Sequence, residues 1–127
     1  MPSRTIPVST AAGRGKAAVV HLSITTRRSS DGTVNISPRG EIDVANADEI
    51  LGAVVAVLAD SLPKQICLDL WQVTLVDSAG IGAFVACFKA AAASGVRVVA
   101  ANPNRTVYRA LWIAGLVDML GSPSPGP

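Results

Sequence analysis

The sequence predicts an α/β fold: a mixed sheet of four or five strands with helices mainly on one face. The pair Asp31-Gly32 is typical of a tight turn between two paired strands and indicates a hairpin early in the chain. Apolar residues then recur at helical spacing, and further on apolar strands alternate with helices. Because strand–helix–strand connections are right-handed crossovers, we expect part of the sheet to be parallel.

The predicted hairpin joins strands at residues 21–27 and 33–38. Residues 39–43 are either an exit loop or a last piece of the second strand. The only histidine, His21, opens the first strand, and a lone histidine is more often a packing or surface residue than a catalytic base.

A helix is predicted over residues 47–60, where the apolar side chains form one stripe. Asn46, with Glu49 three residues later, is expected to start it as a variant of the capping box. Leu62-Pro63 is expected to end it. Later elements follow in order: a strand at 65–70, a helix at 79–94 stopped by Gly95, a strand at 96–101, a helix from Asn102-Pro103 to Gly115, and a short element at 116–120.

The chain of 127 residues is long enough for one compact domain, which we place at residues 19–120. Residues 1–18 and 121–127 are rich in Ser, Pro, Gly and Ala, so flexible tails are predicted there. The N-terminus lacks the apolar core of a signal peptide, and no apolar run is long enough to span a membrane. We therefore expect a cytoplasmic protein with no membrane contact.

Charge argues against direct nucleic-acid binding. The formal net charge is +2, but without the N-terminal Arg4, Arg14 and Lys16 the chain has eight basic and nine acidic side chains. A nucleic-acid interface needs a clustered basic face, and the sequence does not indicate one.

The two cysteines, Cys67 and Cys87, are too few and too far apart for a disulfide framework or a metal site. Their strand and helix are expected to touch, so a redox pair is one hypothesis. Two inert buried thiols are the favoured alternative, since a disulfide needs Cα atoms within about 7 Å. No cofactor or metal is predicted.

Asp77-Ser78 is the most informative pair in the chain, because it lies where a strand and a short connection lead into a helix of small residues. The unpaired N–H groups and the dipole of a helix N-terminus favour negative charge, so a serine there can carry a phosphate. The simpler interpretation is a helix cap. One cap suffices, however, and if Asp77 provides it the Ser78 hydroxyl is free to face solvent.

Gly80 and Gly82 in the first turns of that helix each cost about 1 kcal/mol relative to alanine. Their presence suggests that another element or a partner approaches the backbone closely there. Ser78 as a catalytic nucleophile is disfavoured, because Val76 stands where a nucleophile elbow needs glycine. No phosphate-binding glycine loop with a following lysine is found either. We therefore do not expect an enzyme.

The segment Val76-Asp77-Ser78-Ala79-Gly80-Ile81-Gly82 resembles the phosphorylation motif of bacterial anti-sigma factor antagonists in the STAS domain family. Gly40-Glu41-Ile42-Asp43 resembles the segment before that family's first helix. Asn102-Pro103 and Ala114-Gly115-Leu116 resemble the bounds of its final helix. The similarity covers roughly residues 20–120. Position 79 departs from the pattern, because many members have a second serine where this chain has alanine.

The resemblance implies a single STAS-like domain that binds an anti-sigma factor and so releases a sigma factor for transcription, as in stress responses. The anti-sigma partner, often with an ATP-binding kinase fold, would phosphorylate Ser78 and be released, and a phosphatase would reset the switch. Partner contacts are assigned by resemblance to Asp77, Ser78, Ala79, Gly80 and Gly82. An alternative is a structural STAS-like subunit of a lipid-transport or sensory complex, without phosphorylation.

Overall fold

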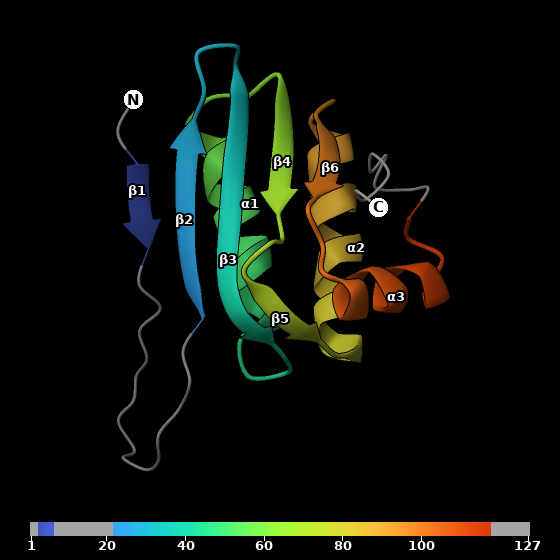
Figure 1. The fold of residues 1–127 in the computed structure, drawn as a ribbon. Helices are drawn as coiled ribbons and strands as arrows, with labels where there is room; N and C mark the ends of the chain where they lie inside the picture. Colours follow the sequence, from blue (N-terminus) through green and yellow to red (C-terminus); the bar gives the residue numbers. More distant parts are fainter. Residues whose placement is uncertain (1–2, 7–21, 118–127) are drawn as a thin grey trace.

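The computed structural model describes residues 3–6 and 22–117. Five strands lie side by side in the order β1-β2-β3-β4-β6, and β5 pairs with the end of β3 (Figure 1). The strands are β1 (Ser3–Ile6), β2 (Ser23–Arg28), β3 (Thr33–Ile42), β4 (Gln65–Asp69), β5 (Val73–Val76) and β6 (Arg97–Ala101). The helices are α1 (Ala47–Asp60), α2 (Ser78–Ala93) and α3 (Arg105–Ile113).

The sheet is mixed, as predicted. Strands β1, β2 and β3 pair antiparallel, whereas β3, β4 and β6 pair parallel through the crossovers that contain α1 and α2. The hairpin between β2 and β3 turns at Gly32, which has a φ of 93°. The backbone N–H of Thr33 donates to Oδ1 of Asp31 over 2.9 Å and fixes this turn.

Strand β3 changes its partner along its length. Residues 33–36 pair with β4, and residues 40–42 pair with β5. The change occurs at Gly40, where the register with β5 shifts and φ is 116°, a value that glycine adopts without strain. Figure 1 shows the lower end of β3 curving toward β5. Residues 39–42 are therefore strand, which settles the alternative that the sequence left open.

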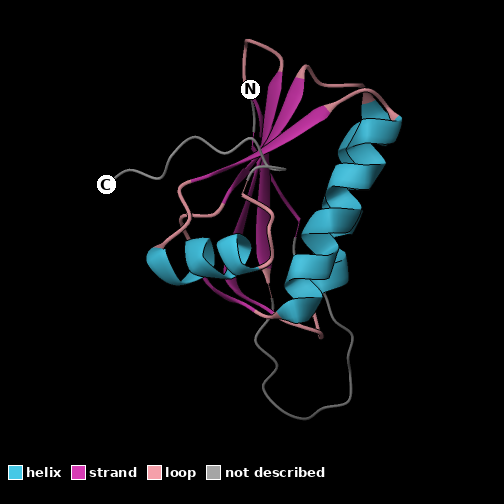
Figure 2. Cartoon of the chain, turned by 90° about the vertical axis from the view of Figure 1, so that its right-hand side faces the viewer, coloured by secondary structure: helices cyan, strands magenta, loops and turns pink. Residues whose placement is uncertain are grey.

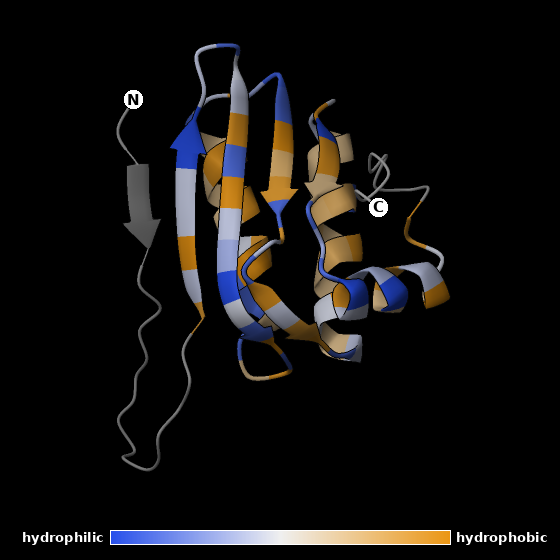
Figure 3. Ribbon diagram, in the orientation of Figure 1, coloured by the Kyte–Doolittle hydropathy of each residue, from blue (hydrophilic) through white to orange (hydrophobic). Residues whose placement is uncertain are grey.

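Two helices cover one face of the sheet and the third lies on the other. In Figure 2, α1 and α2 stand together on one side of the strands and α3 lies on the opposite side. Strand residues alternate between buried apolar and more polar side chains, whereas α2 is apolar along most of its length (Figure 3). This α/β arrangement confirms the predicted fold class.

Strands β1 and β5 were not predicted. Strand β1 lies within the segment 1–18 for which the sequence indicates a tail, and it pairs with the edge of β2. Strand β5 occupies the segment expected to be a plain connection between β4 and α2. The tail predicted at 121–127 and most of the element predicted at 116–120 lie outside the described residues.

The start of α3 also differs from the prediction. Asn104, and not Asn102, is the N-cap: its Oδ1 accepts from the N–H of Val107 over 2.7 Å, and its Nδ2 donates to the carbonyl of Val73 over 3.0 Å. Asn102 instead has a φ of 56° and donates through Nδ2 to Oδ1 of Asp69. Because Asn104 also bonds to Val73 of β5, the N-cap of α3 lies two residues later than the local sequence pattern predicts.

Candidate functional site

Ser78 is the first residue of α2 and is exposed, directly after the end of β5. Asp77 is the N-cap, and its Oδ1 accepts from the backbone N–H of Gly80 over 3.0 Å. Within residues 22–117 the Ser78 hydroxyl has no hydrogen-bond partner. The cap is therefore supplied by Asp77, and the Ser78 hydroxyl is available to solvent.

The connection between β3 and α1, residues 43–46, lies beside the start of α2. The backbone N–H of Asp77 donates to the carbonyl of Ile42 over 3.1 Å, so both connections leave the sheet at the same edge (Figure 1). We call the connection 43–46 together with residues 77–82 the Ser78 edge.

Asn46 fixes the shape of this connection. It is buried, with 6% of its surface exposed. Its Nδ2 donates to the carbonyl of Glu41, and its Oδ1 accepts from the N–H of Asp43, both over 2.9 Å. The expected capping box is therefore wrong: the Asn46 side chain makes no cap bond into α1. The side chain bonds instead to the backbone at the end of β3, where both its donor and its acceptor have partners, as buried polar groups require.

Gly80 is required by packing inside the molecule. A Cβ atom at this position would lie 2.7 Å from Cγ1 of Val76 and 2.8 Å from Cγ2 of Ile42. Gly80 is buried, so its assignment to a partner surface is wrong. Of the two interpretations that the sequence allowed, tight packing on the sheet holds for this glycine.

Gly82 behaves differently, although it lies only two residues further along α2. It is exposed, and a Cβ atom there would meet nothing within 4 Å among the described residues. Its lack of a side chain therefore has no internal packing reason. Ala79 lies between the two cases, because it is half-buried and packs against the core. Asp77, Ser78 and Gly82 are the predicted contact residues that reach the surface.

The surroundings of Ser78 are acidic, a feature that the sequence analysis missed. Glu41 and Asp48 are exposed on either side of the connection 43–46, Asp43 begins it, and Asp77 precedes Ser78. The same connection contains Val44, whose side chain is 82% exposed. Residues 41–48 contain three acids, Glu41, Asp43 and Asp48, and no basic residue. This local excess of acids is the signal that could have revealed the edge.

The two cysteines lie on different faces of the sheet, so the structure contradicts the redox-pair hypothesis. Cys87 is fully buried in the core on α2. Cys67 alternates with the buried Ile66 and Leu68 of β4, and alternate strand residues point to opposite faces. It therefore lies on the face away from α2. Burial raises the pKa of the Cys67 thiol, and it raises the pKa of Cys87 to about 12.

No group of three or more His, Cys, Asp or Glu side chains among the described residues is arranged to hold a metal ion. Within the same part of the chain, no helix is both long and apolar enough to cross a membrane.

Comparison with known proteins identifies the family. Residues 25–125 match the STAS domain. The chain belongs to the STAS domain family. This agrees with the fold and with the motif at Asp77-Ser78, which in this STAS domain lies at the exposed start of α2.

Several relatives of this STAS domain are described as anti-sigma factor antagonists. The anti-sigma-B factor antagonist of Bacillus subtilis is 28% identical over 93 residues, which cover 73% of this chain and 84% of that protein. An anti-sigma factor antagonist from Mycobacterium paratuberculosis has a crystal structure with a TM-score of 0.66 and 26% identity, over 80% of this chain and 84% of that one. The unphosphorylated form of the anti-sigma factor antagonist SpoIIAA has a TM-score of 0.67 at 20% identity, covering 80% of this chain and 88% of that one, which shows a shared fold.

Proposed function

We propose that this protein is an anti-sigma factor antagonist, which binds an anti-sigma factor and is switched off by phosphorylation of Ser78. The observation that carries the proposal is the hydroxyl of Ser78 at the first position of α2, which is exposed and has no hydrogen-bond partner among the described residues, beside the cap supplied by Asp77. The names of the similar proteins support the same function.

The proposed partner surface is the Ser78 edge. It combines a free hydroxyl, the open backbone position at Gly82 and the exposed side chain of Val44. Because carboxylates surround this edge, the partner should offer basic groups around the rim of the contact and an apolar site for Val44.

Phosphorylation would change this edge without unfolding it. A phosphate adds about −1.5 to −2 charges at neutral pH, and the helix N-terminus tolerates such charge. Asp77 remains the cap, so α2 needs no rearrangement. In the complex, however, a bulky dianion would replace a small neutral hydroxyl that packs against the partner next to Gly82. The loss of binding then follows from steric conflict and from the cost of desolvating the dianion against the partner.

The test uses the full chain, its Ser78→Ala and Ser78→Glu variants, and an anti-sigma factor of the ATP-binding kinase type from the same organism. We expect Ser78→Ala to bind like the wild type but to take up no phosphate from ATP. We expect Ser78→Glu to bind at least about tenfold more weakly, a loss of about 1.4 kcal/mol. A phosphatase acting on the labelled wild type should restore binding.

Ser94 supplies the matched control, because it is also exposed but lies at the other end of α2. Ser94→Ala should still be phosphorylated, and Ser94→Glu should bind normally. Labelling of Ser78→Ala, or equal weakening by the two glutamates, would overturn the assignment. If Ser78 stays unmodified in native cells, as judged by intact mass, the structural-subunit alternative gains support.

A further inference from the structure

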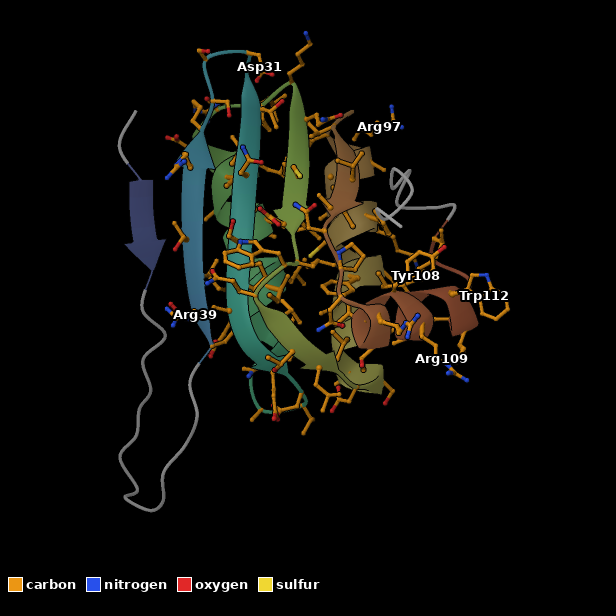
Figure 4. The ribbon with its side chains drawn as sticks, viewed as in Figure 1. Asp31, Arg39, Arg97, Tyr108, Arg109 and Trp112 are labelled. Carbon is orange, nitrogen blue, oxygen red and sulfur yellow. The ribbon has the colours of Figure 1, made fainter. Side chains whose placement is uncertain are left out.

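Helix α3 presents an exposed face with an unusual combination of residues. Its inward side carries Val107 and Leu111, both buried in the core. The outward side collects residues at helical spacing: Arg105, Tyr108, Arg109, Trp112 and Ile113. We call these five residues the α3 face. In Figure 4, Arg109 and Trp112 extend from the helix away from the rest of the molecule.

Two large apolar side chains of this face are in water. Trp112 is 65% exposed and Ile113 is 70% exposed. Single exposed apolar residues are common, but these two are adjacent, and Trp112 lies one turn from both Tyr108 and Arg109. Trp, Tyr and Arg are the residue types most enriched where protein–protein contacts are strongest.

The cations of the face are not neutralised within the described chain. Residues 78–117 contain Lys89, Arg97, Arg105 and Arg109 but no acid. Neither Arg105 nor Arg109 forms an ion pair with any residue of 22–117. Arg105 is moreover the first residue of α3, where the helix dipole disfavours a cation by about 0.3–1 kcal/mol. Stability of the helix therefore does not explain why an arginine stands there.

We propose that the α3 face is a second docking surface, which binds an acidic, partly apolar segment of another protein. Acidic side chains would pair with Arg105 and Arg109, and apolar ones would pack on Trp112 and Ile113. The proposal is independent of the function assigned to the Ser78 edge, because α3 lies on the opposite side of the sheet from α1 and α2 (Figure 2).

Charge and geometry favour this occupant over others. A nucleic acid would need more cations than the two arginines of this face. A membrane-surface helix inserts a continuous apolar stripe, whereas the stripe of α3 is buried through Val107 and Leu111, and only Trp112 and Ile113 remain exposed beside two arginines. A second copy of this chain could offer its acidic Ser78 edge, but such a head-to-tail contact would build rings or open chains of many copies.

The test uses the purified chain alone. A Trp71→Phe variant leaves Trp112 as the single tryptophan, so its fluorescence reports directly on the α3 face. The probe is a short synthetic peptide in which glutamates alternate with leucines, compared with its lysine–leucine and glutamate–serine counterparts. We expect the glutamate–leucine peptide to shift the Trp112 emission to shorter wavelength at peptide concentrations below about 1 mM, with weaker effects of the other two.

Matched charge variants then decide the site. In the Trp71→Phe background, Arg105→Glu/Arg109→Glu should weaken peptide binding at least about tenfold, the size of a hot-spot loss. Lys89→Glu/Arg97→Glu changes the net charge equally but lies outside α3, and should alter binding less than about twofold. Ser78→Glu should have no effect, which separates this proposal from the function of the Ser78 edge.

Several outcomes would overturn the proposal. Equal weakening by both double variants would show a general charge effect, and no emission shift with the glutamate–leucine peptide would show that the face does not bind such a segment. Tighter binding of Trp112 to vesicles of anionic phospholipid than to the peptide would assign the face to a membrane. Sedimentation that shows self-association, lost in Arg105→Glu/Arg109→Glu, would assign it to a second copy.

Discussion

Oδ1 of Asp77 accepts a hydrogen bond from the backbone N–H of Gly80 over 3.0 Å, and this bond gives the capping role to Asp77 and leaves the hydroxyl of Ser78 without it. Because Asp77 caps α2, the hydroxyl of Ser78 does not have to. The cap of α2 therefore does not depend on Ser78, and the proposed phosphorylation would fall on a side chain that does not hold the helix start.

This division of roles can be tested at Asp77. We expect Asp77→Ala to lower the free energy of unfolding by about 1 kcal/mol, since one buried helix N–H loses its acceptor. Asp77→Asn keeps an acceptor oxygen and should lose less. Urea unfolding of the two variants measures both values. Ser78→Ala is the control, and a loss from it as large as that from Asp77→Ala would mean that the serine shares the cap.

Gly80 and Gly82 should respond to alanine with opposite signs. Gly80→Ala forces a Cβ atom against Val76 and Ile42, so we expect a loss of about 1–3 kcal/mol in the free energy of unfolding. Gly82→Ala adds a methyl group in open space on a helix, so we expect a gain of up to about 1 kcal/mol. Thermal or urea unfolding distinguishes them. Equal destabilisation by both changes would contradict the packing described for Gly80.

The contrast between these two glycines shows what the sequence could and could not predict. The helix at 47–60 was predicted with its observed bounds because its apolar stripe is a local pattern. The position of Ser78 at a helix start was likewise local. The difference between Gly80 and Gly82 was not, since it depends on Ile42, which belongs to a distant strand.

The same reason explains the other differences. Strand β5 is short, with two exposed residues between two buried ones, so it carries no alternating pattern, and its identity comes from pairing with β3. The N-cap of α3 is fixed by the bond from Asn104 to Val73 across the fold. The separation of Cys67 from Cys87 could have been predicted, because strict alternation with Ile66 and Leu68 already places Cys67 on the other face.

Cys87 should make the protein sensitive to high pH. Its thiol has an ordinary pKa of 9.0, which burial raises to about 12 in the folded state. Above pH 9 the unfolded chain releases this proton while the folded chain keeps it, so rising pH favours unfolding. The stabilisation is complete below pH 9 and is lost as the pH rises toward 12, with a slope of up to about 1.4 kcal/mol per pH unit.

The measurement is urea unfolding under reducing conditions between pH 8 and about pH 10.5, within the window in which the two thiol states differ. Cys87→Ala should be less stable at pH 8, because it leaves a cavity, but its stability should fall less steeply with pH. The raised pKa of Cys67 affects both proteins equally and cancels in the comparison. Parallel pH curves for wild type and Cys87→Ala would contradict the prediction.

Asn46 supplies the last test, because its two bonds hold the connection beside Ser78. Asn46→Asp keeps an acceptor for the N–H of Asp43. It replaces the amide nitrogen that donates to the carbonyl of Glu41, 2.9 Å away, with an oxygen that cannot donate when ionised. We expect a loss of about 1–3 kcal/mol at neutral pH, from burial of an unpaired charge. A protonated carboxyl can donate again, so the loss should shrink as the pH falls toward 5.

Ala45→Asp is the control, because it adds the same charge at an exposed position of this connection and should change stability by less than about 0.5 kcal/mol. A loss from Asn46→Asp that does not depend on pH would show that the amide donor is not what holds the connection in place.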